Sequence, residues 1–379
     1  MSEADRFGGL ERTLPTPVRL VLVLFLLYVF LVGIGLLEAG IAAAGRGFQE
    51  GLLREVSHPI SGVCAGLLAT VLVQSSSVST ATIVGMVGSG TLPVSLAVPM
   101  IMGANIGTTV TSTLAALGSI RRTAEFQRAF AAATVHDFFN IIAVTVILPV
   151  ELATGVLSGM AEALAELLRG TEFDASQPGT SPIRAAVKAA VGSIEGVIHP
   201  SPGTSLVFVA LGLLLIFTAL TFITRNMRRL VAGSVERAIN RIIGRGGGAI
   251  GIIVGIGITV AVQSSSITTS ILVPLVAAGV LTLPSAYPIT VGANIGTTIT
   301  ALIASLAVMR PEGLVIALVH TLFNISGTLL IFPIRQVRLL PVHMAEWIAA
   351  VATRRRTVVL AYVVGLFIVL PLLGLFVIR

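Results

Sequence analysis

Charged residues are scarce in this chain of 379 residues. Only 11% are Asp, Glu, Lys or Arg, whereas 55% are hydrophobic and the mean hydropathy is +1.00. A soluble domain carries roughly 25% charged residues, so the chain is depleted about twofold. Two long segments, 56–120 and 246–309, contain no Asp, Glu, Lys or Arg. This deficit excludes an ordinary soluble protein and predicts an integral membrane protein.

Residues typical of other protein classes are missing as well. The single cysteine, Cys64, cannot form an intrachain disulfide, and its apolar surroundings predict a packing residue. The sequence has no nucleophile–base pair, metal-ligand cluster or nucleotide-binding loop, which argues against an enzyme and against a bound cofactor. Although the net charge is +7, the basic residues flank apolar stretches instead of forming one face, so no nucleic-acid partner is expected.

The chain does contain a series of apolar stretches. Each has about 20 residues, enough to cross a hydrocarbon core of about 30 Å as a helix, and the alternating segments of about 10 residues that build outer-membrane barrels are absent. The first stretch is long for a cleavable signal and lacks a cleavage site, so it is expected to be a span. The fold class predicted is an all-α integral membrane protein, multi-pass in the lipid bilayer of the inner (plasma) membrane. The stretches are 18–37, 129–150, 203–224, 313–333 and 357–378.

Arginines at the ends of these stretches predict their orientation, because cytoplasmic loops are enriched in basic residues. Three arginines before the first stretch place the N-terminus in the cytoplasm, and the more acidic residues 38–57 are expected outside. Further clusters precede 129–150 and follow 203–224. The leading spans of the two halves then cross in opposite directions, which predicts inverted repeats. The arginines are Arg6, Arg12 and Arg19; Arg121, Arg122 and Arg128; and Arg225, Arg228, Arg229, Arg237, Arg241 and Arg245.

The repeats define the expected domain organisation. Residues 1–169 form the first repeat, 170–202 an external linker, 203–356 the second, inverted repeat, and 357–379 a C-terminal span. Within the second repeat, residues 231–245 mix apolar residues with arginines and are expected to form an interfacial amphipathic helix.

Two polar phrases are duplicated within the apolar sequence. Residues 74–77 and 263–266 both read Gln-Ser-Ser-Ser, and 103–109 and 292–298 both read Gly-Ala-Asn-Ile-Gly-Thr-Thr. The offset is 189 residues for both, since 263 minus 74 equals 292 minus 103. Four consecutive polar side chains would point in all directions around a helix, which packing does not require and which lipid does not tolerate. With prolines between the phrases, the pattern predicts re-entrant hairpins and interrupted helices around a substrate site between two repeats, as in secondary transporters.

The chemistry of this predicted site favours a small oxyanion together with a cation. Because charged side chains are lacking, a substrate would meet hydroxyls, amides and the N-termini of half-helices, which attract anions. Carbonyl and hydroxyl oxygens suit Na⁺, and a cation would offset the cost of burying an anion. The candidate anion ligands are Gln74, Ser75, Ser76, Ser77, Asn105, Ser264, Ser265, Ser266 and Asn294.

A second matched pair follows in each half. Residues 135–140 read Val-His-Asp-Phe-Phe-Asn and residues 319–324 read Val-His-Thr-Leu-Phe-Asn. The histidines and asparagines are shared, and for the histidines we expect a packing role. Asp137 has only Thr321 as its counterpart and is the sole formally charged residue of the stretch 129–150. An acid inside a membrane span is a functional candidate, the alternatives being a structural pair with His136 or a hydrogen bond remote from the lipid.

These phrases resemble the type II sodium–phosphate cotransporter family, over residues of about 55–150 and 245–335. The resemblance implies inverted repeats whose hairpins meet at a central phosphate and sodium site. Asp137 matches the acid of electrogenic members, and Asn140 and Thr113 match ligands of a further sodium. The chain departs from the pattern at Arg122, where the family has an acid, and at Ala293, where it has a serine. The resemblance also implies one Na⁺ site formed by Gln263, Ser264, Ser265, Thr297 and Thr300.

The resulting functional expectation is uptake of inorganic phosphate driven by inward flow of Na⁺. Electrogenic transport by alternating access is expected, with an elevator-like movement favoured. The alternatives are a Na⁺-coupled carrier of another small anion, such as sulfate, arsenate or a dicarboxylate, and an anion channel. The sequence leaves open whether the protein forms a homodimer.

Overall fold

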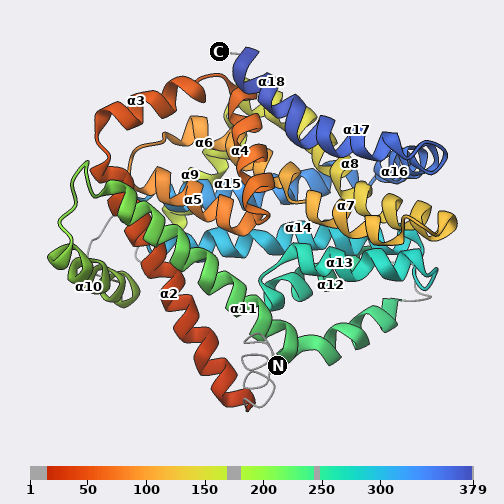
Figure 1. Ribbon diagram of the computed structural model, residues 1–379, viewed down its shortest axis with the longest axis horizontal. Helices are drawn as coiled ribbons and strands as arrows, with labels where there is room; N and C mark the ends of the chain where they lie inside the picture. The colour runs from red at the N-terminus through yellow and green to blue at the C-terminus, as the bar shows by residue number, and fades with distance from the viewer. Residues whose placement is uncertain (1–14, 169–180, 243–247, 378–379) are drawn as a thin grey trace.

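The computed structural model describes residues 15–168, 181–242 and 248–377, except the side chains of residues 46 and 232–242. All regular elements of this part are helices (Figure 1). The first half contains α2 (Thr16–Ala43), α3 (Arg46–Glu55), α4 (Pro59–Val73), α5 (Ser76–Gly88), α6 (Val94–Gly107), α7 (Val110–Ala116), η1 (Leu117–Ser119), α8 (Thr123–Thr154) and α9 (Val156–Leu167). After α10 (Pro182–Val197), the second half contains α11 (Ser205–Ile242), α12 (Gly248–Val262), α13 (Ser265–Ala277), α14 (Leu283–Ser305), α15 (Glu312–Ile331), α16 (Arg335–Arg354), α17 (Thr357–Val364), the π-helix η2 (Gly365–Val369) and α18 (Leu370–Val377).

The membrane-spanning character predicted from the sequence is confirmed. In the described residues, seven helices are long and apolar enough to cross a bilayer, or eight if α3 and α4, which meet at 104°, count as one bent span. Each of the five predicted apolar stretches overlaps one such helix over all but at most two of its residues. Two further spans, Val94–Ser119 and Leu283–Ser305, were not predicted as apolar stretches, because each carries a polar Gly-Ala-Asn-Ile-Gly-Thr-Thr phrase.

Each Gln-Ser-Ser-Ser phrase forms the tip of a hairpin of two short helices. The phrase joins α4 to α5 in the first half and α12 to α13 in the second. Gln74 and Gln263 end the incoming helices in a left-handed conformation, with φ of 58° and 57°. The expectation that the four side chains surround one helix is therefore wrong, because the left-handed glutamine reverses the chain inside the phrase. At 13 residues, α5 and α13 are only about 20 Å long, too short to cross the membrane.

Each hairpin is held by very close packing of two helices. Gly66 on α4 faces Gly103 on α6 so closely that a Cβ on either would collide with a backbone carbonyl of the other helix. Gly255 on α12 and Gly292 on α14 repeat this arrangement. Because these glycines also lie 189 residues apart, the duplicated sequence corresponds to a duplicated helix pair. Close backbone approach through small residues is a common way to associate helices in a membrane.

The two halves differ at the Gly-Ala-Asn-Ile-Gly-Thr-Thr phrase. In the first half the chain breaks at Thr108 and Thr109, between α6 and α7. In the second half α14 runs unbroken through the same phrase. The prediction of interrupted helices is thus confirmed for the first copy and wrong for the second, where α14 keeps its helical geometry through Ser305.

Other predicted segments have a more regular structure than the sequence indicated. The expected linker 170–202 contains the helix α10, although residues 169–180 lie outside the described part. The expected interfacial helix 231–245 begins as a direct continuation of α11 to Ile242, and residues 243–247 are not described.

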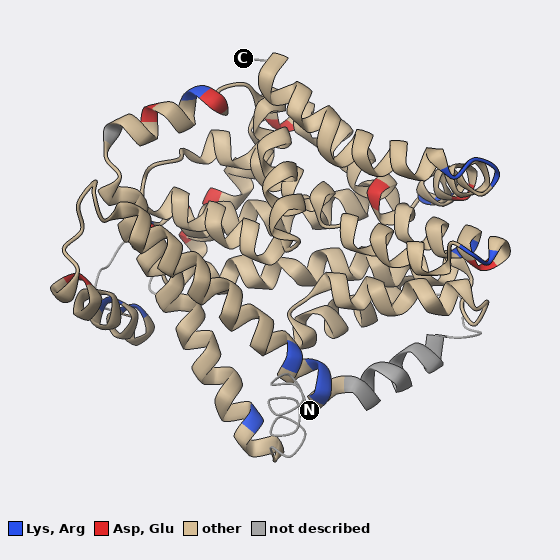
Figure 2. Cartoon of the chain, in the orientation of Figure 1, with Lys and Arg blue, Asp and Glu red and all other residues tan. Residues whose placement is uncertain are grey.

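Charged residues lie mainly at the periphery of the molecule (Figure 2). Basic residues gather at the lower ends of α2 and α11 and at the right-hand ends of α8 and α16, and acidic residues occur on α3 at the opposite side. The hairpins α4–α5 and α12–α13, together with α6, α7 and α14, carry no Asp, Glu, Lys or Arg. These central helices are therefore polar only through hydroxyl, amide and backbone groups.

Candidate functional site

The two hairpin tips line one cavity of about 340 Å³, which we call the hairpin cavity. Both Gln-Ser-Ser-Ser phrases contribute all four of their residues, although they are far apart in the sequence. The remaining wall comes mainly from α11, whose Thr221, Thr224 and Arg225 supply the other polar groups. The structure thus brings together eight of the residues predicted as ligands: Gln74, Ser75, Ser76, Ser77, Gln263, Ser264, Ser265 and Ser266.

The two tips have the same local hydrogen bonds. The side-chain amide of Gln74 donates to the carbonyl of Val71, and that of Gln263 donates to Val260, each at 2.7 Å. The next residue, Ser75 or Ser264, caps the following helix by accepting from a backbone N–H three residues later. These bonds fix the N-termini of α5 and α13 at the cavity, where first-turn N–H groups are available to an anion.

A second set of oxygens lies where the second tip meets α14. The hydroxyl of Thr300 donates to Oε1 of Gln263 at 3.3 Å, so these two residues predicted for sodium are in contact. Thr297 lies on the same helix, is buried and donates to the carbonyl of Ala293 at 2.9 Å. The side-chain carbonyl oxygen of Gln263 points at the hydroxyl of Thr300, and both oxygens are ligands of the kind that a hard cation prefers.

The break after α6 places further hydroxyls against the second hairpin. Thr111 donates to Oγ of Ser266 at 3.3 Å, and Ser112 and Thr269 are hydrogen-bonded at 2.7 Å. Thr113, predicted as a sodium ligand, is fully buried and donates to the carbonyl of Thr109 at 3.2 Å. Sequence reasoning missed Thr111 and Ser112, although they adjoin the duplicated phrase.

Four asparagines form a separate buried cluster between α6, α8, α14 and α15. Asn294 donates to Oδ1 of Asn140 at 2.7 Å and to Oδ1 of Asn324 at 3.1 Å, and Asn140 donates to the carbonyl of Asn105 at 2.9 Å. His320 lies 3.4 Å from Oδ1 of Asn105. Asn105 and Asn294 were predicted to bind the anion beside the serines, but neither lines the hairpin cavity. The amide of Asn294 instead donates to Asn140 and Asn324, and that of Asn105 accepts from Asn324 at 3.3 Å.

Asp137 is completely buried on α8. Its Oδ2 accepts a hydrogen bond from the hydroxyl of Tyr362 on α17 at 2.7 Å. The partner is therefore in the C-terminal span. Of the two structural alternatives, a pair with His136 is not what the hydrogen bonds show, whereas the bond to Tyr362 is a buried hydrogen bond of the kind that the other alternative describes. Tyr362 is one of only three tyrosines in the chain, and its polar group within an apolar span was the signal that could have identified it.

The residues of α11 were missed for a different reason. Arg225 entered the sequence argument only as an orientation signal, whereas it is the one charged residue among those lining the hairpin cavity. Thr221 and Thr224 are three residues apart in an otherwise apolar stretch, a spacing that puts both on one helix face. That polar face was the available signal.

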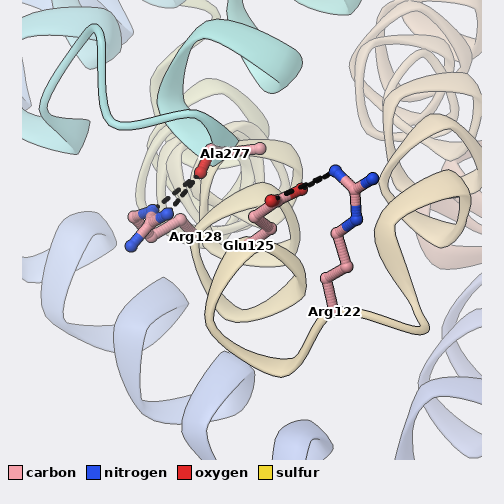
Figure 3. Close-up of polar contacts among 4 residues, drawn as sticks. All are labelled: Arg122, Glu125, Arg128 and Ala277. Carbon is pink, nitrogen blue, oxygen red and sulfur yellow. Dashed lines mark hydrogen bonds and ion pairs between the residues drawn. The ribbon is translucent and has the colours of Figure 1, made fainter.

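The structure shows the surroundings of the two residues that depart from the family pattern, Arg122 and Ala293. Arg122 caps the start of α8 and pairs with Glu125 at 3.1 Å, with 76% of its side chain exposed (Figure 3). Fifteen residues of helix separate it from Asp137, or about 22 Å, so a side chain at position 122 does not reach that acid. Ala293 is fully buried beside Asn294 in α14. Figure 3 also shows Arg128 donating twice, at 2.8 and 2.6 Å, to the carbonyl of Ala277 at the end of α13.

The fold and the cavity are those of a helical membrane protein built around two polar-tipped hairpins. The chain belongs to the Na⁺/Pi-cotransporter family, whose sequence model matches residues 29–166 and 213–340. It is 34% identical to sodium-dependent phosphate transport protein 2A of Rattus norvegicus over 92% of this chain and 66% of that protein. It is 33% identical to protein 2A of Ovis aries, over 96% and 68%, and 33% identical to protein 2B of Homo sapiens, over 98% and 67%. The chain spans about two thirds of the length of these relatives, and no solved structure matches it.

Proposed function

We propose that this protein takes up inorganic phosphate by coupling it to the inward flow of Na⁺. The observation that carries the proposal is the hairpin cavity, in which both Gln-Ser-Ser-Ser tips meet. The relatives are named as sodium-dependent phosphate transport proteins, which supports the same substrate and coupling ion here.

Phosphate suits the chemistry of the hairpin cavity. Ser76, Ser77 and Ser265 are nearly buried, with at most 8% of the residue exposed, and their hydroxyls can donate to phosphate oxygens. The N-termini of α5 and α13 add backbone N–H donors and a favourable dipole. Hydroxyl groups also accept, so a protonated phosphate oxygen finds a partner, whereas sulfate at neutral pH has no proton to offer.

Sodium ions have two proposed positions. The first is formed by Gln263, Ser264, Ser265, Thr297 and Thr300, and the contact between Gln263 and Thr300 supports it. The second lies near Asp137, with Asn140 and Thr113 as the further predicted ligands. A carboxylate inside the protein requires a compensating cation, so a sodium ion there would move with the substrate and make transport electrogenic.

We further propose an alternating-access mechanism in which the present conformation opens to the cytoplasm. Arg225 lines the cavity at the end of α11 that carries the arginine cluster, the end expected inside the cell. The N-terminus would then also be cytoplasmic, in the inner (plasma) membrane. An elevator-like movement of the two hairpins as one unit is favoured by the tight glycine packing of α4 on α6 and of α12 on α14. The repeats 1–169 and 203–356 would then be related by inversion.

Uptake of radiolabelled phosphate into proteoliposomes tests this proposal. An inward Na⁺ gradient should drive uptake above that of protein-free liposomes, and replacement of Na⁺ by K⁺, choline or a proton gradient should abolish it. Unlabelled arsenate, nearly isosteric with phosphate, should compete, and sulfate should not. Equal uptake with K⁺ would refute the coupling, and competition by sulfate alone would refute the substrate.

A further inference from the structure

The C-terminal span reaches the buried acid of the first half. The hydroxyl of Tyr362 donates to Oδ2 of Asp137 at 2.7 Å, although the two residues lie 225 positions apart. The other oxygen, Oδ1, is buried without a hydrogen-bond partner in the described part of the chain. The hydroxyl of Thr109, at the break between α6 and α7, lies beside the carboxylate and donates to the carbonyl of Ile106 at 2.8 Å. One oxygen of the carboxylate is therefore held by the phenol, and the other is left for a cation beside the oxygen of Thr109.

Aromatic packing fixes the position of the tyrosine. Its ring meets Phe130 at a centroid distance of 5.9 Å, Phe138 at 6.3 Å and Phe367 at 6.3 Å. Six residues before it, the guanidinium of Arg356 lies 4.6 Å from the ring of Phe126, which joins the start of α17 to α8. Such aromatic contacts contribute stability beyond simple burial and have a preferred geometry. The phenol thus has little freedom to leave the carboxylate by ring rotation alone.

The backbone next to the tyrosine is also unusual. Residues Gly365–Val369 form a π-helix immediately after α17. Single π-turns inside α-helices are rare and occur frequently at functional sites. The family model matches residues only up to 340, so this whole element lies outside the matched region.

We propose that Tyr362 is a positioning residue for cation binding at Asp137. Its hydroxyl occupies Oδ2 and leaves Oδ1 without a hydrogen bond beside Thr109, whose hydroxyl oxygen can also bind a sodium ion. The C-terminal span then belongs to the coupling machinery and is more than a membrane anchor. This inference rests on the proposed function for its physiological meaning, but sodium binding at Asp137 can be measured without phosphate.

Tyr362→Phe removes the hydroxyl and keeps the ring, so the aromatic packing is preserved. A hydrogen bond to a charged group is worth about tenfold or more in an equilibrium constant. We therefore expect the Na⁺ concentration for half-maximal phosphate uptake to rise about tenfold, with the phosphate dependence at saturating Na⁺ unchanged. Tyr28→Phe is the matched control, because it makes the same change at a tyrosine on α2 whose hydroxyl donates to the carbonyl of Ala186 and not to Asp137. In this control the Na⁺ dependence should stay as in the unmodified protein.

A second measurement separates this inference from the proposed function. The thermal stabilisation of the purified protein by Na⁺, compared with choline and without phosphate, should be reduced in Tyr362→Phe and retained in Tyr28→Phe. If phosphate uptake fails in the unmodified protein while this pattern holds, the proposed function is wrong and the positioning role stands. If uptake is sodium-driven but Tyr362→Phe changes neither its Na⁺ dependence nor the stabilisation, the positioning role is overturned. Absence of Na⁺ stabilisation in the unmodified protein would also overturn it.

Discussion

The two hairpins and the two phrases that follow them show different degrees of symmetry. The hairpin tips agree closely, with left-handed glutamines at φ of 58° and 57° and side-chain hydrogen bonds of 2.7 Å in both. The Gly-Ala-Asn-Ile-Gly-Thr-Thr phrases do not agree, because the first ends α6 in a break and the second lies within the continuous α14. Identical sequence has therefore taken two backbone conformations, depending on what lies around it.

The asymmetry concerns the region around Asp137, the sole formally charged residue of the stretch 129–150. The break between α6 and α7 adjoins Asp137 through Thr109. Thr321, the counterpart of Asp137 in the second half, carries no charge and donates to the carbonyl of Ala317 one turn back. On our account, the symmetric tips bind the substrate anion and the asymmetric break binds the ion that makes transport electrogenic. The following variants test that division, from the largest expected effect to the smallest.

Blocking either tip should abolish transport. Ser76→Leu and Ser265→Leu each place a bulky side chain in the hairpin cavity, and because the tips share one cavity the two variants should be equally inactive. Radiolabelled uptake measures the loss, and size-exclusion chromatography checks that the protein remains monodisperse. Ser193→Leu, at an exposed position on α10, should transport normally. Full uptake in both tip variants would show that these serines serve helix packing and do not line a substrate site.

Removing the acid should separate charge movement from phosphate movement. Asp137→Gly is expected to keep phosphate binding and to transport without current, because no ion is then required to offset the carboxylate. In the unmodified protein each surplus charge is worth about 2.3 kcal/mol per 100 mV, so an inside-negative potential set with valinomycin should accelerate uptake. The same potential should leave Asp137→Gly unaffected. Uptake by the unmodified protein that ignores the potential would contradict the assignment.

Adding a methyl group between the paired helices should be costly in both halves. Gly66→Ala and Gly255→Ala each bring a Cβ against a backbone carbonyl of the facing helix, and overpacking of this kind costs roughly 1–3 kcal/mol. Thermal unfolding in detergent should show similar losses for the two variants, since the packing is duplicated. Gly192→Ala on α10, where nothing lies within 4 Å of the added Cβ, should be neutral or slightly stabilising. A loss confined to one half would show that the two pairs are not equivalent.

The smallest effect is expected where the halves are joined at the surface. Arg128→Met removes two hydrogen bonds to the carbonyl of Ala277 and should lower stability by roughly 1 kcal/mol. Arg122→Gln removes an exposed ion pair and should change stability by less than about 0.5 kcal/mol. Both are measured by thermal unfolding under the same conditions. Equal losses would mean that the bond to Ala277 contributes no more than a solvated pair.

The sequence predicted the symmetric features better than the asymmetric ones. Duplicated spacing identified both tips, because left-handed glutamines and capping serines are properties of the phrase itself. Spacing could not predict that Asn105 and Asn294 turn toward other asparagines, because that depends on how α6, α8, α14 and α15 pack together. Likewise, Tyr362 and Arg225 reach the polar centres from helices that carry no duplicated motif. The sequence also could not predict that only the first copy of the phrase is broken, since the two copies are identical.

The central claim is that both tips enclose one site for phosphate, and cysteine protection tests it directly. Ser77→Cys and Ser266→Cys would each be made in a Cys64→Ala background, which leaves one reactive thiol per protein. Labelling by a small maleimide should fall at both positions when phosphate and Na⁺ are present together, and much less when phosphate is added with K⁺. Protection at only one tip, or labelling that is the same under all conditions, would contradict a shared site.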